Sequence, residues 1–353
     1  MVLNQGVSSK APLALWISPV AEIGGVGRHF IDVASAGIPN FALAFLVPEG
    51  ALAQALRAKG ATVYVGDFGV DNGLLASARA VSSLAKKLGP AVVHSHLAYA
   101  DIALAASRLP RGTVRISSEH GIAAPDIYQS GLRAAVMKQV HHLRTARFAS
   151  IIAVSKSTAE VMQRNWKPLA PVTLIYNGVD APVKSGARPK HLTVLSLARL
   201  SHEKRIGALI SGFAALLEQR PDARLVIAGA GPDEGDLRDQ VRNLAIADSV
   251  TFAGFVDAAQ ALDNASVLVQ LSKWENCSYS LLDAKVRGLG IVATAVGGNP
   301  EIVEQASLLD SLEPQAIAAA IIAQEAGNAA TKWLSVAEMC TLISAHYTEV
   351  VSR

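Results

Sequence analysis

Short apolar runs alternate with helix-like segments along the whole chain, and this alternation constrains the fold more than any other feature. In the first half, the runs that resemble strands lie at residues 13–18, 42–47, 62–65, 91–95, 113–118, 150–154 and 172–176. A second series lies at residues 192–197, 224–228, 249–252, 266–270 and 291–294. Strands that alternate with helices pair in parallel through crossover connections. The pattern therefore predicts an α/β protein with parallel sheets.

The two series are separated by a polar segment that contains glycine and proline. It begins at Asn177-Gly178 and continues through Arg188-Pro189-Lys190, a composition typical of a linker. With 353 residues the chain is long enough for two domains with separate cores. We expect an N-terminal domain over residues 1–183 and a C-terminal domain over 184–335. Each would be Rossmann-like, and the two sheets would face each other across a cleft, with ligands at the carboxyl ends of the strands.

Composition indicates a compact protein of a reducing compartment. Apolar residues make up 51% of the chain, yet no run of about 18 uncharged apolar residues suggests a membrane-spanning helix. The segment Leu13 to Val20 reads as a buried strand rather than a signal core, because it is short and leads into Gly24-Gly25. Two cysteines, Cys277 and Cys340, give neither a disulfide framework nor a metal spacing. We expect a cytoplasmic protein.

Charge is unevenly distributed along the chain. Residues 1–185 contain 18 Lys and Arg against 10 Asp and Glu, whereas residues 186–353 contain 14 against 19. The simple explanation is a solvated surface. A basic first domain would instead attract an anionic acceptor or a membrane surface.

Acids and glycines in the second half indicate a sugar- and phosphate-binding region. Glu275 and Asp283 lie eight positions apart on either side of a turn into a helix, and Gly297-Gly298 follows the next strand. Carboxylates accept hydrogen bonds from neighbouring hydroxyls, while glycine loops and helix N-termini offer N–H groups to phosphate oxygens. This array suits a polyhydroxylated, phosphorylated ligand.

Two cations follow the first strand of the second series. Arg199 and Lys204 lie five residues apart, at a strand end and a helix start, where both would reach one diphosphate. Alone, they would equally suit a solvated loop. The turn Gly229-Ala230-Gly231-Pro232 ends the next strand and reads only as a tight strand-to-helix connection.

Together these motifs resemble the donor site of GT-B fold glycosyltransferases of family 4, which transfer a sugar from a nucleotide donor with retention of configuration. The resemblance covers nearly the whole chain and is densest from Leu192 to Glu301. It implies that a C-terminal helix near residues 336–353 packs back on the first domain. It assigns diphosphate binding to Arg199 and Lys204, sugar hydroxyls to Glu275, ribose hydroxyls to Asp283, and the nucleotide base to the turn at Gly254 and Phe255.

The resemblance also implies roles in the first domain. Gly24 and Gly25 correspond to a loop that faces the donor phosphates and the acceptor, and His120, in a Glu-His-Gly context, corresponds to a histidine near the reacting carbon. The sequence departs from the family at Asp283, where glutamate is usual, and at Asn276-Cys277-Ser278, where glycine, phenylalanine and glycine are usual. Backbone N–H groups of Cys277 and Ser278 remain available to the donor. These departures bear on donor identity more than on reaction class.

Histidines near two strand ends offer a second chemistry. His94 and His96 lie on one side of a strand and suggest a metal pair, but the sequence shows no third ligand. Histidines at strand ends are more often structural, and His120 is the better functional candidate.

One helix, Leu132 to Phe148, is rich in basic residues. A solvated cationic face is the default interpretation, and contact with anionic lipid or a lipid phosphate acceptor is the alternative. Its basic residues are Arg133, Lys138, His141, His142, Arg144 and Arg147.

The sequence thus predicts a retaining glycosyltransferase with a nucleotide-sugar donor and a saccharide or lipid-linked acceptor, an anionic one included. We expect peripheral contact with a membrane and no nucleic-acid partner. No Asp-x-Asp pair occurs, so we expect neither a metal nor another cofactor. Two alternatives remain open: a nucleotide-sugar epimerase, and a noncatalytic sensor of sugar nucleotides.

Overall fold

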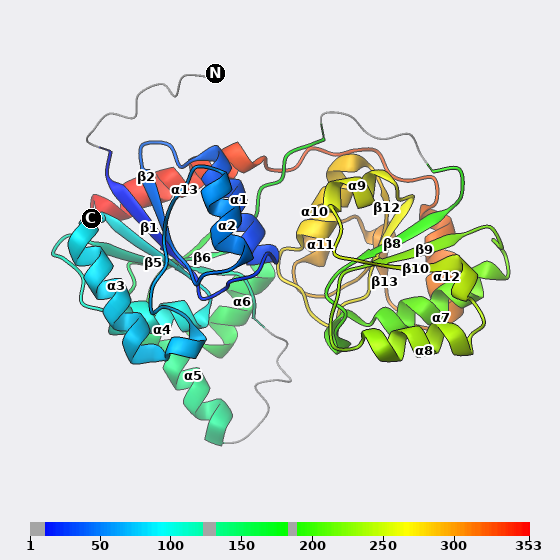
Figure 1. The fold of residues 1–353 in the computed structure, drawn as a ribbon, viewed down its shortest axis with the longest axis horizontal. Helices are drawn as coiled ribbons and strands as arrows, with labels where there is room; N and C mark the ends of the chain where they lie inside the picture. The colour runs from blue at the N-terminus through cyan, green and yellow to red at the C-terminus, as the bar shows by residue number, and fades with distance from the viewer. Residues whose placement is uncertain (1–10, 123–131, 183–188) are drawn as a thin grey trace. The chain divides into compact units, whose positions relative to one another are not determined.

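The computed structural model describes residues 11–122, 132–182 and 189–353, arranged as two compact units (Figure 1). Unit 1 comprises Met1–Gly178 and Leu334–Arg353, and unit 2 comprises Val179–Trp333. The chain thus leaves unit 1 just after Gly178 and returns to it at Leu334. Residues 183 and 184, where the sequence placed the boundary, fall at the edge of a segment outside the described residues.

Unit 1 contains a parallel sheet of seven strands in the order β3-β2-β1-β4-β5-β6-β7. The order reverses at β1, as in doubly wound folds, where ligands bind beyond the carboxyl ends of the strands. The strands, all predicted from apolar runs, are β1 (Leu13–Ile17), β2 (Ala42–Leu46), β3 (Thr62–Tyr64), β4 (Val92–His96), β5 (Val114–Glu119), β6 (Ser150–Ala153) and β7 (Val172–Leu174).

Helices cover both faces of this sheet and bury a core on each. Trp16, Phe30 and Phe45 belong to one core, and Leu15, Phe68 and Leu104 to the other, all fully or almost fully buried. Alternate residues of β1 supply the two cores because successive strand side chains point to opposite faces. The helices of residues 11–178 are α1 (Gly25–Ala36), α2 (Ala51–Ala58), α3 (Leu74–Leu88), α4 (Ala98–Ala106), α5 (Leu132–Arg144) and α6 (Lys156–Asn165), with 3-10 turns η1 (Val70–Asn72) and η3 (Thr145–Arg147).

The C-terminal helix α13 (Val336–Val351) packs within unit 1 (Figure 1). Its Tyr347 hydroxyl accepts a hydrogen bond from Trp16 Nε1 (2.8 Å) and lies 2.5 Å from His94 Nδ1. At the point of crossing, a Cβ on Gly178 would lie 2.4 Å from the carbonyl oxygen of Ser335. Glycine therefore allows the outgoing and returning chains to touch.

Unit 2 contains a parallel sheet of six strands in the order β10-β9-β8-β11-β12-β13. Its last strand was not predicted, because two residues are too short to show a pattern. The strands are β8 (Thr193–Leu197), β9 (Arg224–Ala228), β10 (Val250–Gly254), β11 (Val267–Gln270), β12 (Gly290–Thr294) and β13 (Leu308–Leu309).

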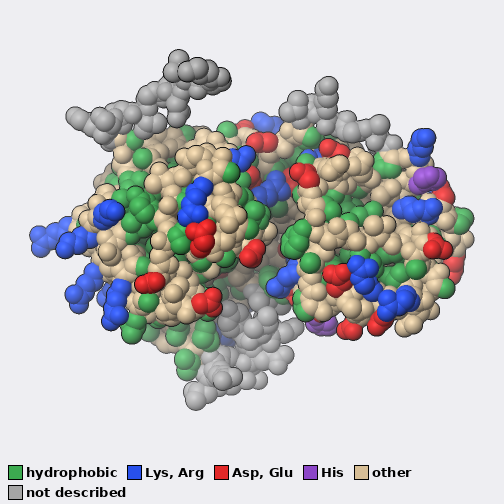
Figure 2. Space-filling view, viewed as in Figure 1, with side chains coloured by type: hydrophobic (Ala, Val, Ile, Leu, Met, Phe, Trp, Pro, Cys, Tyr) green, Lys and Arg blue, Asp and Glu red, His purple; other side chains and the backbone are tan. Residues whose placement is uncertain are grey.

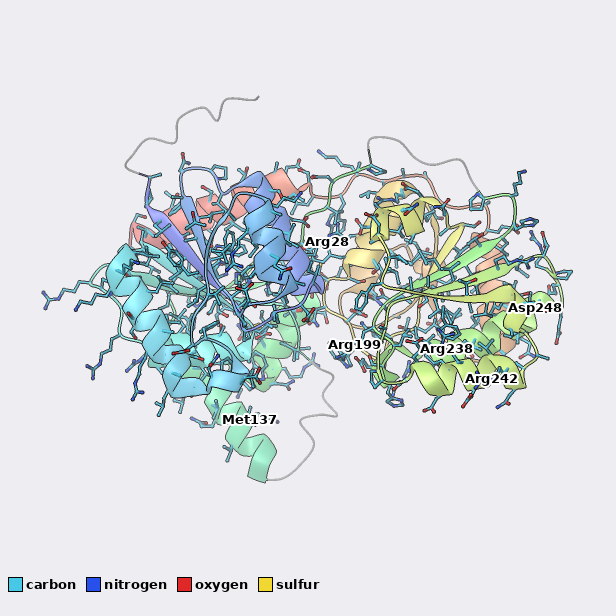
Figure 3. The ribbon with its side chains drawn as sticks, in the orientation of Figure 1. Arg28, Met137, Arg199, Arg238, Arg242 and Asp248 are labelled. Atoms are coloured by element: carbon cyan, nitrogen blue, oxygen red, sulfur yellow. The ribbon has the colours of Figure 1, made fainter. Side chains whose placement is uncertain are left out.

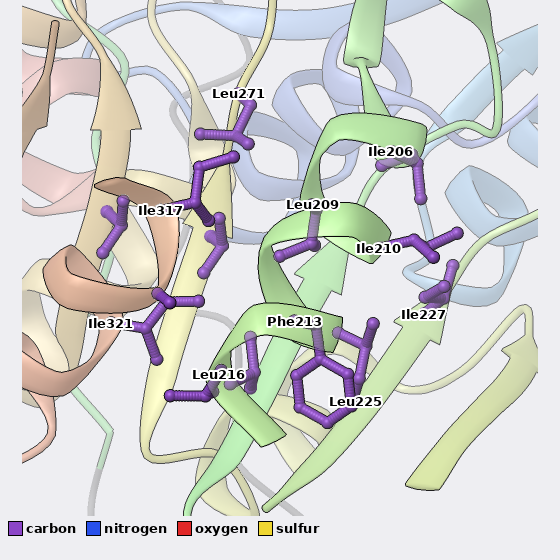
Figure 4. Packing of buried hydrophobic residues seen from close by; sticks show 14 of the residues in the cluster. Ile206, Leu209, Ile210, Phe213, Leu216, Leu225, Ile227, Leu271, Ile317 and Ile321 are labelled. Carbon is purple, nitrogen blue, oxygen red and sulfur yellow. The ribbon is translucent and has the colours of Figure 1, made fainter. Parts of the chain in front are cut away.

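The core of unit 2 forms where α7 and α12 pack on this sheet (Figure 4). Phe213 and Leu216 of α7 and Ile321 of α12 are fully buried in it. A Cβ on Gly212 would lie 2.4 Å from Cγ2 of Ile317, so the two helices approach closely at that glycine. The helices of unit 2 are α7 (Ile206–Leu217), α8 (Glu234–Asn243), α9 (Ala258–Asp263), α10 (Tyr279–Arg287), α11 (Asn299–Ile302) and α12 (Pro314–Gln324), with 3-10 turns η4 (His202–Lys204), η5 (Ala247–Ser249) and η6 (Gln305–Ser307).

The basic helix α5 differs from a uniformly solvated cationic face. Arg144 is buried and ion-paired with both Asp101 (2.7 Å) and Glu119 (2.8 Å), and His141 is buried against the ring of Trp166. The prediction was wrong for these two residues, because Arg144 pairs with Asp101 and Glu119 inside the unit and His141 stacks on Trp166. The side chain of Arg133 lies outside the described residues.

None of the helices in the three described ranges has both the length and the apolar character needed to cross a bilayer.

Candidate donor site and histidine cluster

Lys204 and Glu275 form an ion pair beyond the carboxyl end of the unit 2 sheet. Lys204 ends the 3-10 turn η4, just before α7, rather than opening that helix as predicted. Glu275 lies in the loop between β11 and α10, and its Oε1 also accepts a hydrogen bond from Ser272 Oγ (2.7 Å). A small pocket at these strand ends is lined by residues that include Ser196, Lys204 and Ser272.

A glycine holds the Glu275 loop in place. Gly297, at φ +53°, lies so close that a Cβ there would be 1.8 Å from the carbonyl oxygen of Glu275. A second connection joins this loop to η4, since Lys273 N donates to the carbonyl of Glu203 (2.8 Å). The backbone therefore fixes the position of the carboxylate as well as its ion pair.

The glycine turn after β9 supports the Arg199 loop in the same way. A Cβ on Gly229 would lie 2.0 Å from the carbonyl oxygen of Ala198, and one on Gly231 would lie 2.1 Å from that of Leu200. The N–H of Leu200 donates to the carbonyl of Ala230 (3.0 Å). A turn that showed only a tight connection in the sequence thus determines where Arg199 lies.

Arg199 itself is exposed and donates to Glu203 Oε1 (2.6 Å) (Figure 3). Partial burial would raise the pKa of Glu203, but hydrogen bonds from Ser201 and Arg199 outweigh it and lower that pKa to about 2. Glu203 is therefore a carboxylate at neutral pH. Surface ion pairs of this kind are weak, so Arg199 is free to exchange this partner for another anion.

The α10 N-terminus brings together three of the four residues that depart from the family pattern. Ser278 is the N-cap, and its Oγ accepts from Leu281 N and donates to Gln270 Oε1 (2.7 Å). Asn276 and Cys277 are buried just before it. Serine is a strong N-cap residue, which explains how Ser278 starts a helix where the family usually has glycine.

Asp283 lies in the middle of α10 and is buried. Its Oδ1 lies 3.7 Å from Nη1 of Arg287, whose Nε also donates to Asp263 (3.0 Å). The predicted ribose ligand thus has a cationic neighbour one helical turn away, which the sequence analysis did not consider.

The base-flanking turn lies at the end of β10. Gly254 has φ +64°, and its carbonyl accepts from Gly229 N (2.7 Å). Phe255 is 87% exposed. Such exposure of a large apolar ring leaves its face open to a ligand.

In unit 1, Gly24 and Gly25 form the N-terminus of α1. Gly24 is the N-cap, no side chain caps the helix, and no acidic residue lies in its first turn. The first turn of this 12-residue helix therefore supplies no carboxylate to offset the positive end of the helix.

His120 belongs to a cluster of histidines beyond β4 and β5. Its Nε2 lies 2.8 Å from Nδ1 of His96, and its ring centroid lies 4.8 Å from that of His29. The sequence did not indicate His29, because helix α1 is far from β4 along the chain and the two elements come together only in the fold. Burial lowers the pKa of His120 to about 4 and holds the pKa of His29 and His96 well below the usual value, so all three rings are neutral at pH 7.

The same three histidines have the composition of a metal site. One ring nitrogen from each lies within 4.8 Å of the other two. The sequence analysis had found no third ligand beside His94 and His96. In the structure His96 joins His29 and His120 instead of His94, whose ring nitrogens contact Tyr347 and Ser118.

Two doubly wound units, with cations, a carboxylate and glycine contacts at the strand ends of the second, are typical of GT-B proteins. Residues 23–182 match the family described as Glycosyltransferase Family 4, and residues 180–332 match Glycosyl transferases group 1. The chain belongs to these glycosyltransferases.

Similar proteins agree with this assignment. Glycogen synthase of Mycobacterium tuberculosis is 27% identical over 344 residues, which cover 86% of this chain and 82% of that protein. Alpha-monoglucosyldiacylglycerol synthase of Streptococcus pneumoniae is 35% identical over 120 residues, or 33% of this chain and 26% of that protein. The matches with this synthase and with two further relatives span only 26% to 50% of the relatives' own lengths.

A solved structure shows the same fold. Anabaena HepE, crystallised with UDP-glucose, superposes with a TM-score of 0.76 at 20% identity, covering 97% of this chain and 96% of that one.

Proposed function

We propose that this protein transfers a sugar, with retention of configuration, from a nucleotide-diphosphate sugar to an acceptor hydroxyl in glycan synthesis. The observation that carries the proposal is the Lys204–Glu275 pair, which the backbone contacts of Gly297 and Lys273 hold at the strand ends of unit 2. A cation and a carboxylate side by side suit a ligand that carries phosphate and hydroxyl groups together.

Each group has a distinct task in this proposal. Arg199 and Lys204 neutralise the diphosphate, whose charge grows as the sugar–phosphate bond breaks, while Glu275 accepts hydrogen bonds from sugar hydroxyls. When the donor is bound, the Lys204 ammonium must contact both the Glu275 carboxylate and the phosphate. The nucleoside is bound by Asp283, Gly254 and Phe255. The backbone N–H groups of Cys277 and Ser278 donate further hydrogen bonds to the donor.

We propose a saccharide or lipid-linked acceptor bound by unit 1. The names of relatives include a glycogen synthase and a diacylglycerol-modifying enzyme, so both kinds of acceptor occur among similar proteins. Support for peripheral membrane contact comes from α5, where Met137 (Figure 3), Val136 and Leu143 are exposed and Lys138 follows Met137. Fewer basic residues of this helix are available to a membrane than the sequence suggested, since Arg144 and His141 face inward.

Thermal shift with nucleotides tests the donor site. UDP-glucose is the first ligand to try, because HepE was crystallised with it. A ligand that binds only the folded state raises the midpoint of unfolding. We expect a nucleoside diphosphate to raise it more than the monophosphate, and Lys204→Ala to abolish that difference. Equal shifts for mono- and diphosphates of every base in wild-type protein would refute the diphosphate assignment.

A further inference from the structure

His96 and His120 share a well-aligned contact between two ring nitrogens. Nδ1 of His96 lies 2.8 Å from Nε2 of His120, and the ring centroids lie 5.1 Å apart. A histidine ring nitrogen lies roughly 1.1–1.2 Å from the ring centre, so the two nitrogens face each other almost in line. One hydrogen bond therefore joins the rings, and one of the two nitrogens carries the proton.

The surroundings of His96 decide which nitrogen that is. Its other nitrogen, Nε2, is buried and has no hydrogen-bond partner among the residues that the structure describes. A buried donor or acceptor without a partner costs about 1–3 kcal/mol, and buried N–H groups are left unpaired less often than buried acceptors. The proton of neutral His96 thus belongs on Nδ1, which donates to His120.

The tautomer of His120 follows from this bond. Since burial lowers its pKa to about 4, His120 is neutral at pH 7 and carries one ring proton. With Nε2 accepting from His96, that proton is on Nδ1. His120 is only partly buried whereas His96 is fully buried, so of the two rings His120 is the one that a ligand can approach.

We propose that His96 is a positioning residue that fixes His120 as the Nδ1–H tautomer, ready to donate a hydrogen bond to an oxygen of a bound substrate. This rests on the proposed function for the ligand, but the tautomer itself does not. Neighbouring rings prevent His96 from turning, since Trp16 lies 4.4 Å and Phe30 4.6 Å from it between centroids.

A metal ion held by His29, His96 and His120 is the competing explanation of the cluster. Two nitrogens on a tetrahedral zinc ion, with bonds of about 2.0–2.1 Å, lie about 3.3 Å apart. The observed 2.8 Å is shorter and fits a shared proton. The geometry therefore favours the hydrogen bond.

NMR of the unliganded protein tests the tautomer directly. Long-range ¹H–¹⁵N correlation of ¹⁵N-histidine-labelled protein distinguishes Nδ1–H from Nε2–H, and we expect Nδ1–H for both His96 and His120. Observation of Nε2–H on His120 would overturn the proposal. So would joint shifts of the His29, His96 and His120 signals on addition of one equivalent of Zn²⁺.

Substitutions test the consequence for transfer. In His96→Asn the amide N–H occupies nearly the position of Nδ1–H, so His120 keeps its tautomer, whereas His96→Leu removes the donor. We expect kcat to fall about 10–100-fold in His96→Leu, with KM little changed, and to recover largely in His96→Asn.

His94→Leu is the matched control, because it removes an equally buried ring whose nitrogens contact Tyr347 and Ser118 instead. It should leave the His120 tautomer unchanged. Equal kcat in His96→Leu and wild type, with both folded, would contradict the positioning role. Absence of transfer by wild-type protein would refute the proposed function instead, while the NMR result still decides the tautomer.

Discussion

At the scale of single residues, the candidate site consists of charges that are already paired. Lys204 contacts Glu275, and Arg199 contacts Glu203, before any ligand arrives. Pairing of this kind orients side chains in advance, which reduces the entropy lost when they bind a charged group. Its cost is that a phosphate has to compete with a carboxylate.

Loss of either cation should reduce transfer without loss of the fold. We expect Arg199→Ala and Lys204→Ala each to reduce kcat/KM about 10²–10³-fold, since each removes a donor to the developing charge of the leaving group. Arg242→Ala is the control, because Arg242 is about as exposed as Arg199 and is also paired with an acid on its own surface (Figure 3). Steady-state kinetics on the three variants decide the matter; wild-type rates in both site variants would remove the diphosphate assignment.

The sequence predicted which residues lie in the site only where they belong to a recognisable motif. Glu275, Lys204 and Arg199 stood out in the sequence, and the first two lie in contact. By contrast, Arg144 and Arg147 looked alike in the sequence, yet Arg144 is buried and Arg147 is exposed. What separates them is the pair Asp101 and Glu119, which come from other elements and leave no local signal.

At the scale of elements, glycines at close backbone contacts determine where the loops lie. Gly229 and Gly231 support the Arg199 loop, and Gly297 supports the Glu275 loop. The strands themselves were predicted closely, because apolar runs buried on both faces are conspicuous. The close contacts were not predicted, because a sequence shows that a glycine is present but does not show which backbone segment it touches.

Gly297→Ala should therefore destabilise unit 2 and impair the site. Gly60→Ala is the control, since Gly60 also has a positive φ (+76°) but no neighbouring atom of the described residues within 4 Å of its Cβ position. The left-handed backbone alone costs about 1–2 kcal/mol in either variant. We expect a further loss of about 1–3 kcal/mol in Gly297→Ala, from the clash with Glu275. Denaturant titration measures the difference, and equal losses in the two variants would contradict the contact.

Arg144 joins α5 to the ends of α4 and β5 through two buried carboxylates. Burial raises the pKa of Asp101 to about 6, although Arg144 opposes the rise. Because the folded pKa lies above the unfolded value of 3.8, the stability contributed by protonated Asp101 is complete below about pH 4 and is lost as pH rises through about 6.

Arg144→Met should cost about 3–5 kcal/mol at pH 7.5, since it leaves buried carboxylates without their cation. The loss should shrink at pH 5, where Asp101 takes up a proton. Arg147→Met, three residues along, should cost little at either pH because Arg147 is exposed. Denaturant titrations at the two pH values measure this, and an equal loss at both pH values would refute the ionic explanation.

At the scale of the whole molecule, two units with different sheets and different charge make up one chain. Figure 2 shows Lys and Arg side chains along the edge of unit 1 near α3, whose last turn carries Lys86 and Lys87. The α/β class and both parallel sheets were predicted correctly from the sequence. The grouping of the three histidines was not predicted, because His29, His96 and His120 come from three separate parts of the chain.

Metal independence is the first prediction at this scale. The proposal assigns charge neutralisation to Arg199 and Lys204, so transfer should persist in excess EDTA. Activity assays with and without chelator test this. Loss of activity that Mg²⁺ or Mn²⁺ restores would show that an ion shares the task.

The central claim is sugar transfer with retention, and product analysis tests it most directly. Purified protein is incubated with a nucleotide sugar that raises its unfolding midpoint, together with a panel of saccharide and lipid-linked acceptors, and the products are identified by NMR and mass spectrometry. The account predicts one free nucleoside diphosphate for each glycoside formed, with the anomeric configuration of the donor kept. An isomerised nucleotide sugar without a glycoside, a glycoside of inverted configuration, or tight donor binding without any turnover would contradict it.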